Sequence, residues 1–422
     1  MNSEHEASTG AREAYVWIWL PGTMEPVVAG RLYDEGGSPQ RYLFAYGRSY
    51  LENEDAIPLS PYELSLQRGE QEPSGLGKMP PCLRDAGPDA WGQRVLISKY
   101  GEAPLTDLDY ILLSGSDRIG ALDFQSSSAE YEARRSLAAP MDVLLRAAEL
   151  VEKREPLPPD LHLALLHGSS VGGARPKALI EEGDGQYIAK FSTSTDTYDV
   201  VKSEFVTMRL AERCGLDVAP VRLTQSMGRD VLLVERFDRA RSNGQTFRKH
   251  MLSGLSLLML DEMEARHASY LDLADRIRQR FDHHRETLRE LFERLCFNIL
   301  VGNTDDHARN HAAFWDGQHL NLTPAYDICP QPRTGGEASQ AMDIEGIRGR
   351  LSTLDNARSI CERFMLSREE ATELANRQVR TIEAHWDAVC DDANMAVGER
   401  RRLWRGAVLG SFCFEGWDAV KA

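Results

Sequence analysis

Acidic and amide side chains that suit phosphoryl transfer are concentrated in the stretch GNTDDHARNH and in the segment that follows it. Asp305 and Asn310 lie shortly after an apolar run that ends at Val301, and Asp327 follows a second short apolar run, LTPAY. Phosphoryl transfer needs one carboxylate that orients and deprotonates the attacking hydroxyl, and oxygen ligands that hold Mg²⁺ on the nucleotide phosphates. The D-x-x-x-x-N spacing from Asp305 to Asn310 equals that of the kinase catalytic loop, and Asp327 would take the place of the DFG aspartate. We therefore predict Asp305 as the catalytic residue, and Asn310 and Asp327 as magnesium ligands.

Two other interpretations of this stretch remain open. His307 and His311 stand four residues apart and could be two zinc ligands on one helix face, although neither an HExxH motif nor a cysteine accompanies them. The stretch could also be a solvated polar loop, which is an unusual feature between an apolar helix and an apolar strand.

A glycine-rich stretch, HGSSVGGARPKA, is a candidate for binding nucleotide phosphates. Its Gly172 and Gly173 would let backbone N–H groups close on phosphate oxygens, and Lys177 would add a positive charge. The stretch departs from the P-loop pattern GxxxxGK[ST] and precedes a predicted strand, so a plain glycine-rich turn is an equal alternative.

Lys190 is a second candidate for binding phosphate, because it stands among apolar neighbours in the strand-like stretch YIAKF. A buried ammonium group needs a partner, and phosphates together with Glu204 on the next helix would supply one, as in kinases. The alternative is a lysine at a strand edge that extends to water.

The stretch LLVERFDR marks the junction between the sheet-rich and the helical parts of the chain. In a two-lobed nucleotide enzyme, backbone groups around Glu235 and Phe237 would hydrogen-bond an adenine edge. The residues alone support only a strand that ends at a domain junction.

Apolar periodicity predicts the elements that must position these residues. The N-terminal part reads as a meander of strands, the middle as an antiparallel-leaning lobe with one helix, and the C-terminal half as helical. The strands are expected at 15–20, 27–32, 41–46, 178–180, 187–191, 221–224 and 231–235, and the helices at 89–100, 141–151, 202–214, 270–280, 285–301, 368–389 and 400–414. We expect a polar tail over 1–13, an N-terminal α/β subdomain over 14–135, a nucleotide-binding lobe over 136–240 and a helical catalytic lobe over 241–422.

Composition narrows the classes of protein that this chain can represent. With 49 Lys and Arg against 65 Asp and Glu, its net charge of −16 argues against non-specific binding to duplex DNA. We find neither a candidate membrane span nor the pattern of a signal peptide, so we expect a cytoplasmic protein. The seven cysteines form no CxxC pair, and we expect them to be reduced thiols.

Taken together, these motifs resemble the HipA family, the serine/threonine kinase toxins of bacterial type II toxin–antitoxin systems. The resemblance covers nearly the whole chain and rests on LRDAGPDAWGQRVL, GGARPKA, LLVERFDR, GNTDDHARN and LTPAYDI. It implies an α+β, two-lobed, protein-kinase-like fold with a small β-rich N-terminal subdomain and an all-helical C-terminal lobe.

The resemblance also implies roles for individual residues. It places the catalytic aspartate at Asp305, with an active-site histidine at His307. Inactivation by autophosphorylation would fall on Ser170 in the glycine-rich loop, with Ser169 adjacent. The other implied assignments are metal ligation by Asn310 and Asp327, phosphate binding by Lys190, and the hinge at Glu235 and Phe237.

The function implied by the resemblance is an ATP- and Mg²⁺-dependent protein kinase that phosphorylates a translation component, in the family an aminoacyl-tRNA synthetase. Its expected partner is a small DNA-binding, HipB-like antitoxin, so that contact with DNA is indirect. A catalytically quiet co-repressor and a small-molecule kinase are the alternatives.

Overall fold

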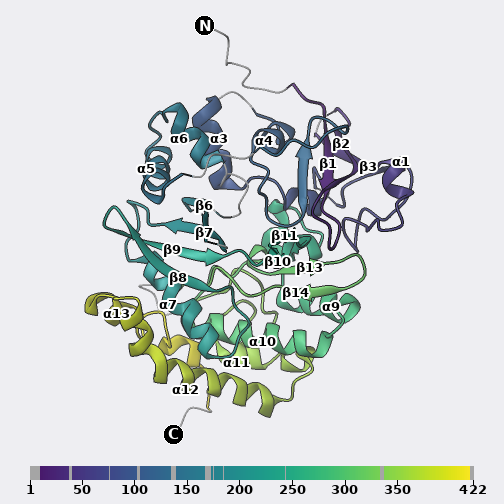
Figure 1. Cartoon of the computed structure of the whole chain (residues 1–422). Helices are drawn as coiled ribbons and strands as arrows, with labels where there is room; N and C mark the ends of the chain where they lie inside the picture. Colours follow the sequence, from purple (N-terminus) through teal and green to yellow (C-terminus); the bar gives the residue numbers. More distant parts are fainter. Residues whose placement is uncertain are drawn as a thin grey trace. The chain divides into compact units, whose positions relative to one another are not determined.

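The computed structural model describes residues 10–418 except 38–39, 76, 102–104, 135–138, 167–172, 174, 184, 243 and 333–336. Its helices and strands form an α+β fold, which confirms the expected class (Figure 1). The chain divides into two compact units. The first comprises 1–195, 224–252 and 314–318, and the second comprises 196–223, 253–313 and 319–422. The four-part division expected from the sequence stays a prediction.

The first unit begins with a five-stranded antiparallel sheet of order β4-β3-β2-β1-β5. This arrangement confirms the predicted meander, and the apolar residues of β1 and β3 are buried while the connecting turns carry glycine. The strands are β1 (Glu13–Ile18), β2 (Val27–Asp34), β3 (Tyr42–Tyr46), β4 (Glu70–Gln71) and β5 (Leu122–Gln125), and the helices in this part are α1 (Arg48–Leu51), α2 (Pro81–Arg84), α3 (Ala90–Tyr100) and α4 (Asp107–Leu113).

A second sheet, of order β6-β7-β9-β8, lies mainly in the first unit and carries Lys177 and Lys190. Helices α5 and α6 cover one face of this sheet, because their leucines share a core with Ala178, Ala189 and Leu233 of the strands (Figure 1). The elements are α5 (Met141–Glu152), α6 (Pro159–Leu166), β6 (Lys177–Glu182), β7 (Gly185–Phe191), β8 (Val221–Ser226), β9 (Arg229–Glu235) and the hairpin β10 (Arg239–Ser242) and β11 (Gln245–Arg248).

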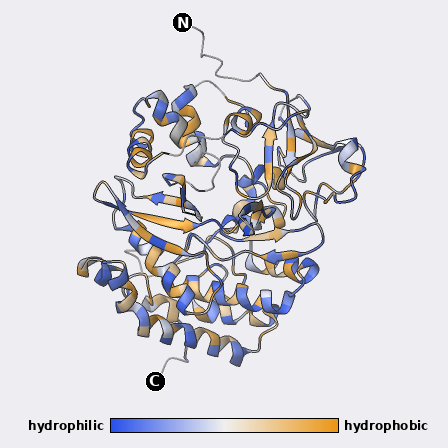
Figure 2. Cartoon of the chain, viewed as in Figure 1, coloured by the Kyte–Doolittle hydropathy of each residue, from blue (hydrophilic) through white to orange (hydrophobic). Residues whose placement is uncertain are grey.

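The second unit is built around α10 (His284–Val301), whose residues are almost all buried from Leu288 onwards. Helix α9 (Tyr270–Arg280) and helix α12 (Arg368–Asp392) pack against it, and α7 (Val200–Arg213) packs against α12. Figure 2 shows the mixture of hydrophobic and hydrophilic residues along α12, which buries Leu374, Ile382 and Trp386 on its inner side. The remaining elements of the C-terminal part are β12 (Met251–Ser253), α8 (Gly254–Leu257), η1 (Glu262–His267), η2 (Ala308–Asn310), β13 (Ala312–Trp315), β14 (Leu320–Leu322), α11 (Leu354–Arg358), η3 (Cys361–Phe364), α13 (Val397–Leu403) and η4 (Ser411–Phe414).

Two expectations about the C-terminal part need correction. It is mainly but not entirely helical, since the short strands β11 to β14 lie beyond residue 241. The helix expected over 400–414 is also wrong. Helix α13 ends at Leu403, and Arg405 and Leu409 adopt positive φ angles of 62° and 50°, which a continuous helix does not allow.

Within the described residues, no helix is both long and apolar enough to cross a membrane. All seven cysteine thiols are buried and none forms a disulfide.

Candidate active site

The predicted catalytic loop follows directly from the end of α10 in the second unit. Gly302 ends the helix with a φ of 68°, and a Cβ atom at this position would lie 2.8 Å from the carbonyl oxygen of Ala407. Both the left-handed backbone and the close approach favour glycine here. The Asn303 side-chain amide then donates to Oδ1 of Asn298 at 3.0 Å, which ties the loop back to the helix.

Asp305 is exposed at the start of this loop, while its neighbour Asp306 is buried. Although Asp305 is exposed, the surrounding chain displaces part of the water around its carboxylate, and this desolvation raises its pKa. The negative charges of Asp327 and Asp306 act in the same direction, whereas His307 lowers the pKa. Asp305 and Asp327 are thus close enough to interact electrostatically. The second unit brings together the two carboxylates that the sequence assigned to one site.

Asn310 is oriented by its own loop. Its side-chain Nδ2 donates to the backbone carbonyl of Asp305 at 3.2 Å, and its backbone N–H donates to the carbonyl of His307 at 2.8 Å. Because Nδ2 is committed to the loop, Oδ1 points away from that bond and is suited to bind a cation. Amide and carboxylate oxygens are the ligands that Mg²⁺ prefers, so Asn310 and Asp327 fit a magnesium site by their chemistry.

Asp327 has a left-handed backbone, with a φ of 59°, which is uncommon for a residue other than glycine. The chain is held on both sides of it by bonds within the second unit. Before it, the N–H of Ala325 donates to the carbonyl of Asp217 at 2.8 Å. After it, the hydroxyls of Thr207 and Tyr198 donate to the carbonyls of Ile328 and Pro330. Strained backbone is retained where neighbouring contacts over-determine it, and such positions cluster at functional sites.

Asp306, which has no role in the predicted chemistry, accepts two side-chain hydrogen bonds in the interior of the second unit. Its Oδ2 accepts a hydrogen bond from the Tyr270 hydroxyl and another from His311 Nε2 at 3.0 Å. Burial opposes ionisation of this carboxyl, but the charge and hydrogen bond of His311 and the bond from Tyr270 outweigh burial and lower its pKa. Only one signal was present in the sequence, namely a second carboxylate directly beside the predicted catalytic one.

The two histidines do not form a metal site in the structure. His311 is bound to Asp306, and Nδ1 of the half-buried His307 has no hydrogen-bond partner in the part of the chain that the structure describes. The same residues contain no group of three His, Cys, Asp or Glu side chains that could hold a metal ion. The zinc alternative therefore has no third ligand among them. His307 lies in the loop beside Asp305, and its catalytic role stays a prediction.

Lys177 and Lys190 stand directly opposite each other on β6 and β7 of the first unit. Residues opposite in an antiparallel pair project from the same face, where two like charges repel. Lys177 is almost fully buried, and its Nζ lies 3.4 Å from Oδ2 of Asp89, the residue that caps α3. Burial raises the pKa of Asp89, and the Lys177 ammonium opposes that shift. Lys190 is only half-buried. Two ammonium groups on one face of neighbouring strands form a concentration of positive charge that is suited to bind an anion.

The LLVERFDR stretch forms the end of β9 and a buried ion-pair cluster of the first unit. Glu235 is exposed at the strand end, while the ring of Phe237 contacts that of Phe314 edge to face at 6.1 Å. Arg236 and Asp238 are buried. The Arg236 guanidinium donates to both oxygens of Asp238 at 3.0 and 2.7 Å. The buried charged residues thus anchor the end of β9. The adenine-binding role of Glu235 and Phe237 stays a prediction.

Part of the glycine-rich loop lies outside the described residues. Gly172, Ser169 and Ser170 belong to that part, so their predicted roles are untested. Gly173 is described, with a φ of 111°, and a Cβ atom there would lie 2.4 Å from Nζ of Lys177. Glycine at this position allows the backbone to approach the Lys177 ammonium.

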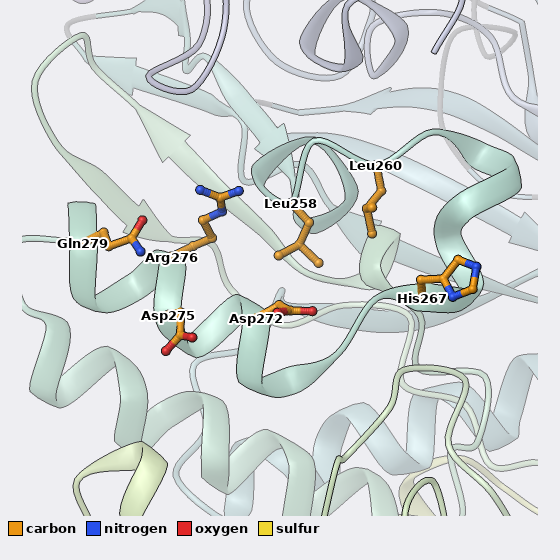
Figure 3. A pocket seen from close by; sticks show the side chains of 7 residues that line it. All are labelled: Leu258, Leu260, His267, Asp272, Asp275, Arg276 and Gln279. Atoms are coloured by element: carbon orange, nitrogen blue, oxygen red, sulfur yellow. The ribbon is translucent and has the colours of Figure 1, made fainter. Parts of the chain in front are cut away.

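A cavity of about 380 Å³ lies elsewhere in the second unit. Figure 3 shows its lining side chains, which come from the residues after α8, from η1 and from α9. The lining combines two leucines with charged and polar groups, namely Leu258, Leu260, His267, Asp272, Asp275, Arg276 and Gln279. No residue of the predicted catalytic loop lines it.

Comparisons with known proteins agree with the motifs. The sequence model of the family "HipA-like C-terminal domain" matches residues 169–386, and that of "HipA N-terminal domain" matches residues 19–125. The chain is 28% identical over 303 residues to "Putative kinase Y4mE" of Sinorhizobium fredii, an alignment that covers 68% of this chain and 71% of that protein. It is 25% identical over 272 residues to "Serine/threonine-protein kinase toxin HipA" of Shewanella oneidensis, which covers 57% of this chain and 60% of that protein.

A solved structure shares the fold. A chain from the Shewanella oneidensis complex of HipA, HipB and its operator DNA matches with a TM-score of 0.69 at 18% identity, covering 95% of this chain and 97% of that chain. This likeness extends over nearly the whole length of both chains.

Proposed function

Since this chain belongs to the HipA family, we propose that it is a serine/threonine protein kinase that uses ATP and Mg²⁺ and acts as the toxin of a toxin–antitoxin pair. The observation that carries the proposal is the joint placement of Asp305, Asn310 and Asp327 in the second unit. Their types and spacing are those that phosphoryl transfer requires. The kinase names of the relatives support the same activity.

In this mechanism the exposed Asp305 carboxylate would accept the hydrogen bond of a substrate hydroxyl, orient its oxygen toward the γ-phosphorus and take the proton as the new P–O bond forms. The bond from the γ-phosphorus to the β,γ-bridging oxygen would break at the same time, and ADP would leave with that bond's electron pair. The raised pKa of Asp305 favours proton acceptance in the transition state. Asn310 and Asp327 would hold Mg²⁺, which supplies neutralisation of the phosphate charge when it is bound. Lys190, with Lys177 beside it, would orient the phosphates, and Glu235 and Phe237 would contact the adenine through their backbone groups.

The proposed protein substrate is a translation component, an aminoacyl-tRNA synthetase by family resemblance. The proposed partner is a HipB-like antitoxin, because the solved structure with the shared fold is a complex of HipA, HipB and operator DNA. Contact with DNA would pass through that antitoxin, in keeping with the net charge of −16.

We further propose that phosphorylation of Ser170, or of the adjacent Ser169, inactivates the kinase. A phosphate adds roughly −1.5 to −2 charge. In a loop that closes on nucleotide phosphates, this charge would repel ATP. The expected consequence is a lower affinity of the modified protein for ATP.

The test is an incubation of purified protein with Mg²⁺ and labelled ATP, beside Asp305→Ala, followed by mapping of phosphate by mass spectrometry. We expect label on Ser170 or Ser169 in the wild-type protein and none in the variant, which should still bind ATP. Dephosphorylation before the assay removes any phosphate acquired during expression. An Asp305→Ala protein that transfers phosphate at the wild-type rate would refute the role of Asp305. In a parallel incubation with added cell extract, label found only on a small metabolite would refute the protein-kinase assignment.

A further inference from the structure

The buried Asp306 carboxylate binds two other side chains of the second unit, those of Tyr270 and His311. None of these three residues takes part in the proposed chemistry. Tyr270 opens α9, His311 follows the predicted magnesium ligand Asn310, and Asp306 follows the predicted catalytic Asp305. Tyr270 is 0% exposed, His311 2% and Asp306 3%, so all three polar side chains are shielded from solvent. A buried carboxylate that lost one of its two donors would be partly unsatisfied, which is costly.

The hydrogen bonds indicate which of the three groups carry a proton. Oδ2 of Asp306 accepts both bonds, so the Tyr270 hydroxyl and His311 Nε2 are the donors. Burial, reinforced by the charge of Asp306, raises the pKa of Tyr270 well above its usual value, so the hydroxyl keeps its proton. The Tyr270 ring also meets the His311 imidazole edge to face at 5.7 Å, which restricts rotation of the imidazole.

We propose that Tyr270, Asp306 and His311 form a clasp that sets the separation of Asp305 from Asn310, which makes them positioning residues for phosphoryl transfer. The Asp306–His311 bond closes the loop between the residue after the base and the residue after the metal ligand. This inference rests on the proposed kinase function and deepens it.

The backbone around the clasp holds the same loop from two sides. The carbonyls of Thr304 and Asp306 accept from the N–H groups of Ala341 and Met342 at 3.0 and 3.2 Å. On the other side, the N–H of Gly254 donates to the carbonyl of His311 at 2.6 Å, and a Cβ atom at Gly254 would lie 2.5 Å from the Ala308 carbonyl oxygen. The backbone bonds anchor the loop, whereas the clasp links its two ends through side chains.

Tyr270→Phe is the sharpest test, because it removes one hydroxyl and leaves the ring. Its matched control is Tyr50→Phe in the first unit, since Tyr50 is likewise buried and its hydroxyl donates to the Ile57 carbonyl at 2.8 Å. If the clasp positions the base and the metal ligand, Tyr270→Phe lowers kcat by roughly tenfold to a hundredfold, the scale of small misplacements of reacting groups. The KM for ATP should change less than twofold, while the Mg²⁺ concentration for half-maximal rate rises. Tyr50→Phe should keep kcat and the Mg²⁺ dependence.

A second pair of variants separates positioning from packing. His311→Gln keeps an N–H donor for Asp306 and His311→Ala removes it, so the glutamine variant should recover most of the kcat that the alanine variant loses. Equal kcat in the two variants would overturn the proposal, as would a kcat within twofold of wild type in Tyr270→Phe.

Hydrogen exchange does not depend on catalytic activity, so it tests the clasp separately from the proposed kinase function. Amide hydrogen exchange of the peptide covering 303–311 reports the bonds from the N–H groups of His307 and Asn310. We expect at least tenfold faster exchange in Tyr270→Phe and no change in Tyr50→Phe. A wild-type protein that transfers no phosphate would refute the kinase function and leave the clasp to be judged by exchange alone. Equal exchange in the two tyrosine variants would then refute the clasp.

Discussion

Replacing Asp238 by asparagine should strongly destabilise the first unit, because this carboxylate is the acceptor for two buried arginines. It accepts from Arg236 at 2.7 and 3.0 Å, from Arg239 at 2.8 Å and from the backbone N–H of Gly120 at 2.8 Å. An asparagine side chain in its place would keep a single acceptor oxygen and no charge. Among the described residues, the two guanidinium groups would then retain one carboxylate partner, Asp117, at 2.9 and 2.6 Å.

The loss of stability can be estimated from the pKa shift of Asp238 and from the typical cost of breaking a buried ion pair. Burial opposes ionisation of Asp238, but the charges of Arg236 and Arg239 outweigh it and lower its pKa from 3.8 to about 2. That difference corresponds to on the order of 2 kcal/mol of stability from the ionised group. Breaking a buried ion pair by removing one partner typically costs about 3–5 kcal/mol. We therefore expect Asp238→Asn to lower the free energy of unfolding by about 2–5 kcal/mol at pH 7.

The lowered pKa of Asp238 also determines how its contribution to stability changes with pH. A carboxyl with a depressed folded-state pKa contributes its stability above the unfolded pKa, here 3.8, and loses it as the pH falls through about 2. The difference between wild type and Asp238→Asn should therefore be roughly constant from about pH 5 to 8 and should shrink between about pH 4 and 2.

The assay is urea unfolding followed by tryptophan fluorescence at several pH values, with Asp55→Asn as the control at an exposed carboxylate of the same unit. The control should change the free energy of unfolding by less than about 0.5 kcal/mol. A loss below about 1 kcal/mol in Asp238→Asn, or a loss that does not change below about pH 4, would refute the reasoning.

Two further substitutions, at a half-buried carboxyl and at the glycine that ends α10, are tested by stability alone. Burial raises the pKa of Glu63 from 4.5 to about 7, so ionisation of this carboxyl should destabilise the folded chain by on the order of 3 kcal/mol as the pH rises from 4.5 through 7. Glu63→Gln keeps an acceptor for the N–H of Cys82 and should abolish that decline, and parallel pH profiles for the two proteins in urea unfolding would contradict this. Gly302→Ala should destabilise the second unit by about 1–3 kcal/mol, because the new Cβ would meet the Ala407 carbonyl at a positive φ. Unchanged unfolding of Gly302→Ala in urea would show that the loop can shift to accept the methyl group.

Local sequence was sufficient to predict most elements and the composition of the catalytic loop. The helix expected over 270–280 has those bounds in α9, and the strands around Lys190 and Glu235 appear as β7 and β9. These predictions succeed because helical and strand periodicities are properties of neighbouring residues. The helix expected over 400–414 failed because the backbone turns at Arg405 and Leu409, which the apolar spacing does not reveal.

What only the tertiary structure decided is which of several similar groups is buried and with which partner. Asp305 and Asp306 are identical in type and adjacent in sequence, yet one is exposed and the other is the acceptor of Tyr270 and His311. Lys177 forms an ion pair with Asp89, which lies far away along the chain. The types and spacing of the reacting residues are set by sequence, because chemistry depends on them directly. The protonation state and orientation of each group depend on desolvation and on partners, which exist only once distant segments have packed together.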